Sequence, residues 1–124
     1  MSRVPNNQEG DSIDYDFEND SIFFYKKGAS YKHSLDLDDI IIDFDDNDVI
    51  KGVEILNASK KLNIPKRFLN NPISLNLKLK ISDEKIELNI NVKVKMRNSS
   101  VPKTISTYGT NNFGLPSGTM AMTC

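Results

Sequence analysis

Residues Ile40 to Leu56 read IIIDFDDNDVIKGVEIL, and this stretch decides the predicted fold. Two apolar segments flank the run Asp45-Asp46-Asn47-Asp48, and Asp and Asn tolerate the backbone conformations of tight turns. The pattern predicts a β-hairpin in which one strand ends at Phe44, the next returns over residues 49–56, and the tip is acidic.

The residues before this hairpin predict another one. Ile13, Tyr15 and Phe17 alternate with acidic residues, which is the period of a half-buried strand. Residues 18–21 have turn chemistry, and the aromatic-rich segment 22–25 is β-prone. After a loop, Leu35 and Leu37 begin a third strand that continues to Phe44.

The residues after the central hairpin predict a short helical connection and a third hairpin. Asn57 is placed to cap a helix over 58–62 with its side chain, and Pro65 can open a second short turn over 65–69. Two strands with a solvated face then follow. Their alternating apolar residues are Ile73, Leu75, Leu77, Leu79, Ile81, Ile86, Leu88, Ile90, Val92, Val94 and Met96.

Together these segments predict an α+β protein that is mainly β. The expected architecture is an antiparallel six-stranded meander sheet of three hairpins, with one short helical connection packed on the apolar face. We expect a single β-rich domain over 11–97, because residues 1–10 and 98–124 lack an apolar period. These ends are predicted to be a disordered N-terminus and a disordered Ser/Thr/Gly-rich tail.

The apolar runs and the cysteine content of the sequence indicate the localisation of the protein and exclude some kinds of site. No run approaches the ~20 apolar residues of a membrane span, and no signal peptide is visible, so we expect a cytoplasmic protein. The only cysteine is Cys124, which excludes an internal disulfide and a cysteine-rich metal site.

Charge is distributed unevenly along the chain. Residues 1–56 contain 14 acidic and 5 basic residues, whereas residues 57–124 contain 3 acidic and 11 basic residues. Acidic and basic strands could lie side by side and neutralise each other across a sheet. Alternatively, each half could present a surface of one sign to a partner.

Several short motifs resemble a known family. They are Tyr15-Asp16, Glu18, Asp20 and Ile22, then Asp43-Phe44-Asp45, and finally Gly52-Val53-Glu54-Ile55-Leu56 with Ala58-Ser59. In this order they are similar to the prokaryotic domain of unknown function 2283, over roughly residues 12–62. The resemblance implies a β-rich fold without an established activity, and an association with small toxin-like genes. Asp48 replaces the glycine that is usual at the hairpin tip, so we expect Asn47 to take the left-handed conformation there.

The acidic hairpin also matches part of a calcium-loop pattern. Asp43, Asp45, Asn47 and Glu54 fall at positions one, three, five and twelve, and hard cations prefer such oxygen ligands. Position six is Asp48 where glycine is required, and both flanks are predicted strands. Calcium binding through these four residues is therefore an alternative to a solvated hairpin tip.

A basic partner protein is the other means of relieving the negative charge. The predicted binding surface combines the two acidic clusters, Asp14, Asp16, Glu18, Asp20, Asp45, Asp46 and Asp48. We expect a small interaction module, which the family resemblance suggests is antitoxin-like. Self-association through exposed sheet edges is a further alternative, and the oligomeric state is left open.

Two other functions are not expected. Lys78, Lys80, Lys93, Lys95 and Arg97 form a basic strip, but no aromatic residue is interleaved with them to stack on bases, so we expect no nucleic-acid binding. His33, predicted to lie in a surface loop, is the only histidine, and no glycine-rich phosphate loop or nucleophile arrangement is visible. We therefore do not expect an enzyme or a cofactor other than calcium.

Overall fold

The structure is a computed structural model that describes residues 6–9, 12–28, 30–70, 72–112 and 114–123. It contains ten strands and two short helical segments. They are β1 (Asn6–Glu9), β2 (Ser12–Asp16), β3 (Ser21–Tyr25), β4 (His33–Leu37), β5 (Ile40–Phe44), β6 (Ile50–Ile55), α1 (Ala58–Leu62), the 3-10 helix η1 (Lys66–Phe68), β7 (Pro72–Ile81), β8 (Lys85–Met96), β9 (Ser99–Thr110) and β10 (Gly118–Thr123).

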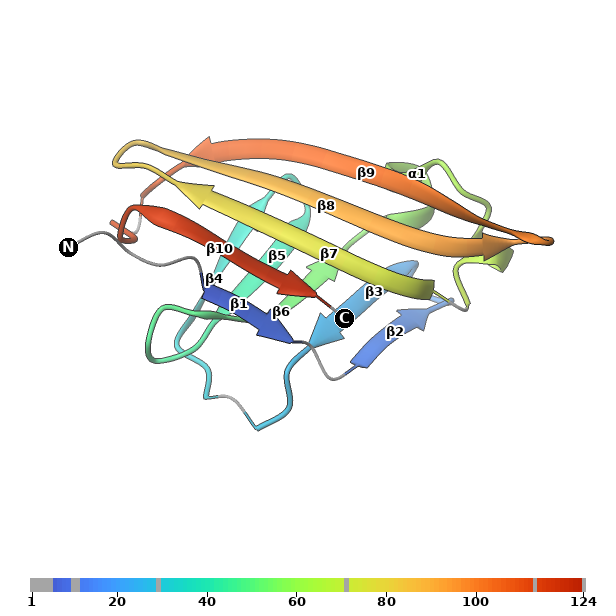
Figure 1. The fold of residues 1–124 in the computed structure, drawn as a ribbon, viewed down its shortest axis with the longest axis horizontal. Coiled ribbons are helices and arrows are strands. Elements are labelled where there is room, and N and C mark those ends of the chain that lie inside the picture. The colour runs from blue at the N-terminus through green and yellow to red at the C-terminus, as the bar shows by residue number, and fades with distance from the viewer. Residues whose placement is uncertain (1–5, 10–11, 29, 71, 113, 124) are drawn as a thin grey trace.

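The strands form two sheets that pack face to face. One sheet, here called sheet A, has the order β1-β10-β7-β8-β9; β1 is parallel to β10 and the other pairs are antiparallel. Sheet B has the order β2-β3-β6-β5-β4 and is antiparallel throughout. In Figure 1 the long strands of sheet A lie in front, and the strands of sheet B cross behind them.

The mainly β class is therefore confirmed, but the single six-stranded meander is wrong. β6 pairs with β3 and β5, and β7 pairs with β8 and β10, so the chain leaves one sheet at β6 and enters the other at β7. The helical connection joins the two layers. A sandwich buries the apolar faces of both sheets against each other, whereas a single meander would leave most of its apolar face to one short helix.

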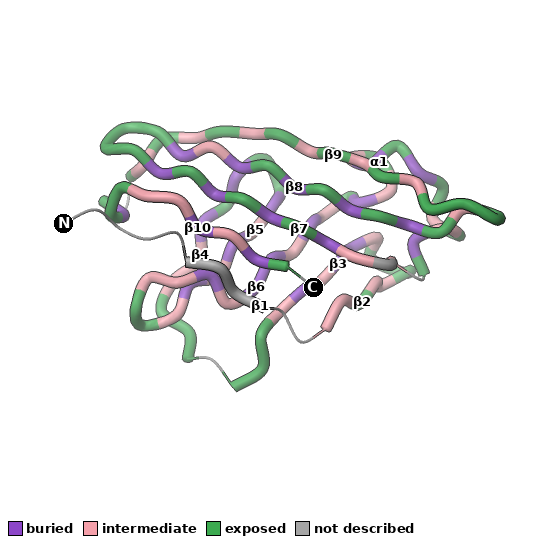
Figure 2. The backbone as a smooth tube through the Cα atoms, in the orientation of Figure 1, coloured by how far each residue is buried: buried purple, intermediate pink, exposed green. Residues whose placement is uncertain are grey.

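One core fills the space between the sheets. Leu77, Leu79, Ile90 and Val92 of sheet A and Phe24 of sheet B belong to the same buried cluster. Buried and exposed residues alternate along β7 and β8, as the sequence predicted (Figure 2). The side chain of Ile73 lies outside the described residues.

The predicted disordered tail over 98–124 is contradicted by strands β9 and β10. β9 pairs with β8 over its whole length, and β10 pairs with β7 from Gly118 to Thr123. These strands complete the backbone hydrogen bonds that β7 and β8 would otherwise leave open, so few apolar side chains suffice to hold them. Met120 and Met122 nevertheless reach the core.

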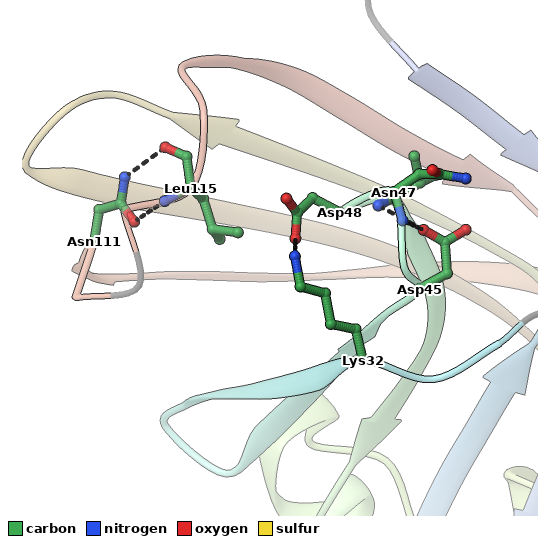
Figure 3. Close-up of polar contacts among 7 residues, drawn as sticks. Lys32, Asp45, Asn47, Asp48, Asn111 and Leu115 are labelled. Atoms are coloured by element: carbon green, nitrogen blue, oxygen red, sulfur yellow. Dashed lines mark hydrogen bonds and ion pairs between the residues drawn. The ribbon is translucent and has the colours of Figure 1, made fainter.

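A side-chain clasp fixes the connection between β9 and β10. The amide of Asn111 donates to the carbonyl of Leu115 at 2.9 Å and accepts from its backbone N–H at 2.9 Å (Figure 3).

In β9, Gly109 lies so close to Leu37 of sheet B that a Cβ there would clash with its Cδ2. At the other end of the chain, residues 6–9 of the predicted disordered N-terminus form β1, while residues 1–5 and 10 lie outside the described residues.

Two turns of sheet B differ from the prediction. The third strand is divided by a two-residue turn in which Asp38 and Asp39 have φ of 53° and 63°, the left-handed values of a tight hairpin. At the hairpin tip, Asp48 and not Asn47 is left-handed, with φ of 59°. The tip is a short turn closed by a left-handed residue, and Asp48 occupies the position that glycine fills most easily.

Candidate functional site

The first acidic cluster contributes to architecture. The carboxylate of Asp20 accepts hydrogen bonds from the Ser59 backbone amide at 3.0 Å, the Ser59 hydroxyl at 2.6 Å and the Tyr15 hydroxyl at 2.7 Å. Burial of Asp20 raises the pKa of its carboxyl group, but the hydrogen bonds from Ser59 and Tyr15 have the larger combined effect, so the pKa is lowered. Asn57 is left-handed and its side chain does not cap α1, contrary to the prediction, because Asp20 supplies the acceptor from across the fold.

Asp16 is likewise used within its own turn. Its carboxylate accepts from the side-chain amide of Asn19 at 2.7 Å and from the Asn19 backbone N–H at 3.1 Å, which lowers its pKa. Glu18 is exposed in the same turn. Of the first predicted cluster, only Asp14 therefore lies on an open strand face.

The hairpin tip also uses its acidic residues internally. Asp45 accepts from the backbone amides of Asn47 at 2.8 Å and Val49 at 3.0 Å, and Asp48 forms an ion pair with Lys32 at 3.0 Å (Figure 3). Asp46 remains exposed. The tip and the turn at residues 17–20 lie at opposite ends of sheet B, separated by the roughly 20 Å length of a six-residue strand. The two predicted clusters therefore cannot form one binding surface.

The calcium site is contradicted by the same geometry. Asp45 and Asn47 lie at the tip, whereas Asp43 and Glu54 lie on neighbouring strands and face outward from the sheet. Among the residues that the structure describes, no group of three or more acidic, histidine or cysteine side chains could hold a metal ion. His33 is not in a surface loop: it begins β4, and its ring stacks on Phe44 at 5.0 Å.

The outer face of sheet B brings together acidic residues from four strands. Register places Asp14, Phe23, Glu54, Ile41 and Asp36 in one row across β2, β3, β6, β5 and β4. The next row contains Tyr25, Gly52, Asp43 and Ser34. We call the surface formed by Asp14, Phe23, Tyr25, Asp36, Ile41, Asp43, Gly52 and Glu54 the acidic face.

Two carboxylates at the centre of the acidic face interact unfavourably. Asp43 pairs with Gly52 and Glu54 pairs with Ile41, so the two acids are diagonal neighbours on one face. Partial burial, and then the negative charge of Asp43, raise the pKa of Glu54. Asp43 is held in place by the hydroxyl of Ser34, which donates to it at 2.6 Å.

Aromatic and apolar groups border these carboxylates. Phe23 and Ile41 are half-buried on either side of Glu54, and the hydroxyl of Tyr25 donates to Asp14 at 3.3 Å. A Cβ at Gly52 would meet Tyr25 Cβ at 3.4 Å and Asp43 Oδ2 at 3.7 Å, so Gly52 is buried between these two residues and lets them approach each other closely. The acidic face therefore combines negative charge with apolar contact area, which is the composition of many protein interfaces.

The outer face of sheet A has the opposite charge. Its exposed residues include Lys78 and Lys80 of β7 and Lys93 and Lys95 of β8, as the sequence predicted, whereas Arg97 of the predicted strip lies in the turn after β8. Since the inner faces of the two sheets share one core, these outer faces point away from each other. The acidic strands β2–β6 and the basic strands β7–β9 thus lie in separate sheets. Acidic and basic strands among them do not lie side by side in one sheet, so they do not neutralise each other's charge in that way.

Sequence reasoning missed Phe23, Tyr25, Asp36 and Ile41 as neighbours of Asp43 and Glu54. The run Ile40-Ile41-Ile42 concealed the alternation, because Ile40 and Ile42 are buried and Ile41 faces outward. Gly52 is the signal that could have found the surface, since a glycine inside a strand often marks close approach.

Within the described residues, no helix has the length and apolar character to cross a membrane.

Comparison with known proteins gives a family and two relatives. The sequence profile of the family described as "Protein of unknown function (DUF2283)" matches residues 12–59. A protein of Methanosarcina mazei named "Putative hypoxanthine phosphoribosyltransferase" is 41% identical over 109 residues, which are 88% of this chain and 89% of that protein. "Uncharacterized protein MJ0789" of Methanocaldococcus jannaschii is 61% identical over 54 residues, 44% of this chain and 47% of its own length. No solved structure matches significantly.

Proposed function

Because the chain belongs to the DUF2283 family, whose description assigns no activity, we propose a function from its geometry: it is an interaction module whose acidic face binds a basic partner protein. The observation that carries this proposal is the pair Asp43 and Glu54, two carboxylates that repel each other on an open sheet face. A lysine or arginine placed between them would relieve the repulsion.

The surrounding residues suit a protein partner. Phe23, Ile41 and Tyr25 are half-buried and offer contact area beside the charges. A basic toxin, such as a ribonuclease with its own phosphate-binding surface, would be one member of this class. The binding residues differ from the sequence prediction, because Asp16, Asp20, Asp45 and Asp48 are used inside the molecule.

The name of the Methanosarcina relative suggests phosphoribosyl transfer, and we propose that this chain does not catalyse it. Binding a diphosphate commonly uses a glycine-rich loop followed by a helix N-terminus. In the described part of the chain, α1 follows Ile55-Leu56-Asn57 and η1 follows Ile64-Pro65, and neither is a glycine-rich loop. A catalytic assay with the diphosphate substrate should therefore show no turnover.

Binding of a fluorescein-labelled decalysine peptide tests the acidic face with matched variants. Asp14→Asn/Asp43→Asn/Glu54→Gln removes three charges from the acidic face, and Glu18→Gln/Asp39→Asn/Asp46→Asn removes three from exposed turns. Three contacts of about 0.5 kcal/mol each correspond to roughly tenfold weaker binding for the first variant only. Equal losses in both variants, or binding that salt does not weaken, would contradict the proposal.

A further inference from the structure

We infer that the outer face of sheet A binds single-stranded nucleic acid. The sequence of β7 and β8 contains no aromatic residue among the lysines, which indicated no nucleic-acid binding. In the structure, Tyr108 of β9 lies beside them, because β9 pairs with β8 and Tyr108 is opposite Glu87. Its side chain is 73% exposed, far more than a residue that stabilises the core.

Positive charge lines this face. Lys78 and Lys80 alternate with buried residues of β7, and Lys93 and Lys95 do the same in β8, so all four project from one side of the sheet. Side chains two residues apart along a strand are about 6.6 Å apart. Glu87 lies among them, but it forms an ion pair with Lys85 at 2.9 Å.

Between the lysines lies a row of amides with a fixed orientation. The hydroxyl of Thr104 donates to Asn91 Oδ1 at 2.6 Å, and the hydroxyl of Ser106 donates to Asn89 Oδ1 at 2.6 Å. These bonds occupy the amide oxygens and leave the Nδ2–H groups as donors, for which the described residues supply no acceptor. Lysines and oriented amides together form a surface of hydrogen-bond donors that suits the oxygens of phosphates and bases.

The face is also hollowed. A depression of about 420 Å³ is lined by Asn76, Lys78, Asn89, Asn91 and Thr104, with Ala121 among the larger side chains. A second depression, of about 350 Å³, shares Asn89 and is also lined by Glu87, Ser106 and Tyr108. The two depressions lie side by side at Asn89 and together extend over residues of β10, β7, β8 and β9.

Tyr108 favours a single strand over a duplex. The ring can stack on a base only if the base is unpaired, and such stacking does not depend on sequence. Lys85 Nζ, which is paired with Glu87, lies 4.9 Å from the ring centroid and supports the ring, so the phosphate contacts would come from the other lysines of this face. We therefore expect little sequence preference and a strong dependence on salt.

Fluorescence anisotropy with labelled 12-nucleotide oligouridine and oligothymidine tests the inference. If four lysines contact phosphates, affinity should fall about 50-fold between 50 and 200 mM salt. Tyr108→Leu should weaken binding about 5- to 100-fold, and the matched Tyr31→Leu, at a residue 58% exposed in the loop before β4, should not. Lys78→Gln/Lys80→Gln should weaken it at least tenfold, and Lys60→Gln/Arg67→Gln should not.

Two results would overturn the inference. Undiminished binding by Tyr108→Leu would show that no base stacks on the ring. Equal binding of a 12-base-pair duplex, or equal competition by decaglutamate, would show a surface that attracts any polyanion. Circular dichroism of each variant checks that the fold is retained, and decalysine binding should be unchanged by the Tyr108→Leu, Lys78→Gln/Lys80→Gln and Lys60→Gln/Arg67→Gln variants.

Discussion

The carboxylate of Asp20 accepts two hydrogen bonds from Ser59, one from the backbone amide at 3.0 Å and one from the hydroxyl at 2.6 Å, although the two residues are 39 positions apart in the sequence. This contact ties the turn between β2 and β3 to the start of α1. The Asp20 carbonyl also accepts from the Ala58 amide at 2.9 Å. Two parts of the family motif that are distant in sequence thus stabilise each other, which gives these residues an architectural role.

Asn in place of Asp20 should destabilise the fold. Asp20 has φ of 53°, which Asn tolerates, so Asp20→Asn isolates the loss of the charged acceptor. We expect a loss of about 1–3 kcal/mol in the free energy of unfolding, and about 1 kcal/mol for Ser59→Ala. Urea denaturation of both single variants and the double variant should show that the losses are not additive. Additive losses, or a similar loss in the exposed Glu18→Gln variant, would contradict this role.

The C-terminal strand should contribute substantially to stability. Met120 is 1% exposed and packs in the core, so Met120→Ala should cost about 2–4 kcal/mol. Thr119→Ala, one residue earlier on the outer side, should change stability by less than about 1 kcal/mol. If thermal denaturation shows no difference between the two variants, the segment does not fold as β10.

The Asp48→Gly variant should be more stable than the natural chain, because glycine adopts the left-handed backbone conformation of this position without strain. The left-handed conformation costs a residue with a side chain about 1 kcal/mol relative to glycine, while the exposed ion pair with Lys32 contributes a few tenths. We expect a net gain of roughly 0.5 kcal/mol by urea denaturation. The Lys32→Gln variant measures the contribution of the ion pair separately. If Asp48→Gly lowers the free energy of unfolding by more than Lys32→Gln does, Asp48 is not strained at the tip.

Sequence pattern predicted the elements better than their partners. Alternation over 75–96 was confirmed because β7 and β8 bury one complete face. It failed for β9, because Lys103, Thr107 and Gly109 share the inward side with Val101 and Ile105 and interrupt the apolar period. The turn at Asp38-Asp39 was missed because it lacks the usual Asn-Gly or Gly residues.

The division into two sheets could not be read from the sequence. Pairing of β6 with β3 joins segments about 30 residues apart, and local periodicity contains no information about such contacts. The acidic face depends on this pairing, because it sets Glu54 beside Phe23. Charge asymmetry between the halves was the signal that survived, since each half forms most of one sheet.

The free energy of unfolding should depend on pH through Glu54. Its pKa is raised in the folded protein, so the folded state binds more protons than the unfolded state above the ordinary value of 4.5. Glu54 therefore costs stability as pH rises past that value, and the cost is absent when both states are protonated. Glu54→Gln should be more stable than the natural chain at pH 7 and nearly equal to it at pH 4. A constant difference between the two pH values would show that charge is not the cause.

Mapping of the partner surface by NMR tests the central claim most directly. The amide signals of the ¹⁵N-labelled protein would be followed while decalysine is added at 50 mM salt. We predict that the largest shifts occur at Phe23, Ile41 and Glu54 and that 200 mM salt reduces them. If the largest shifts occur instead at the hairpin tip, residues 45–48, or are spread evenly over all acidic turns, the acidic face is not the binding surface.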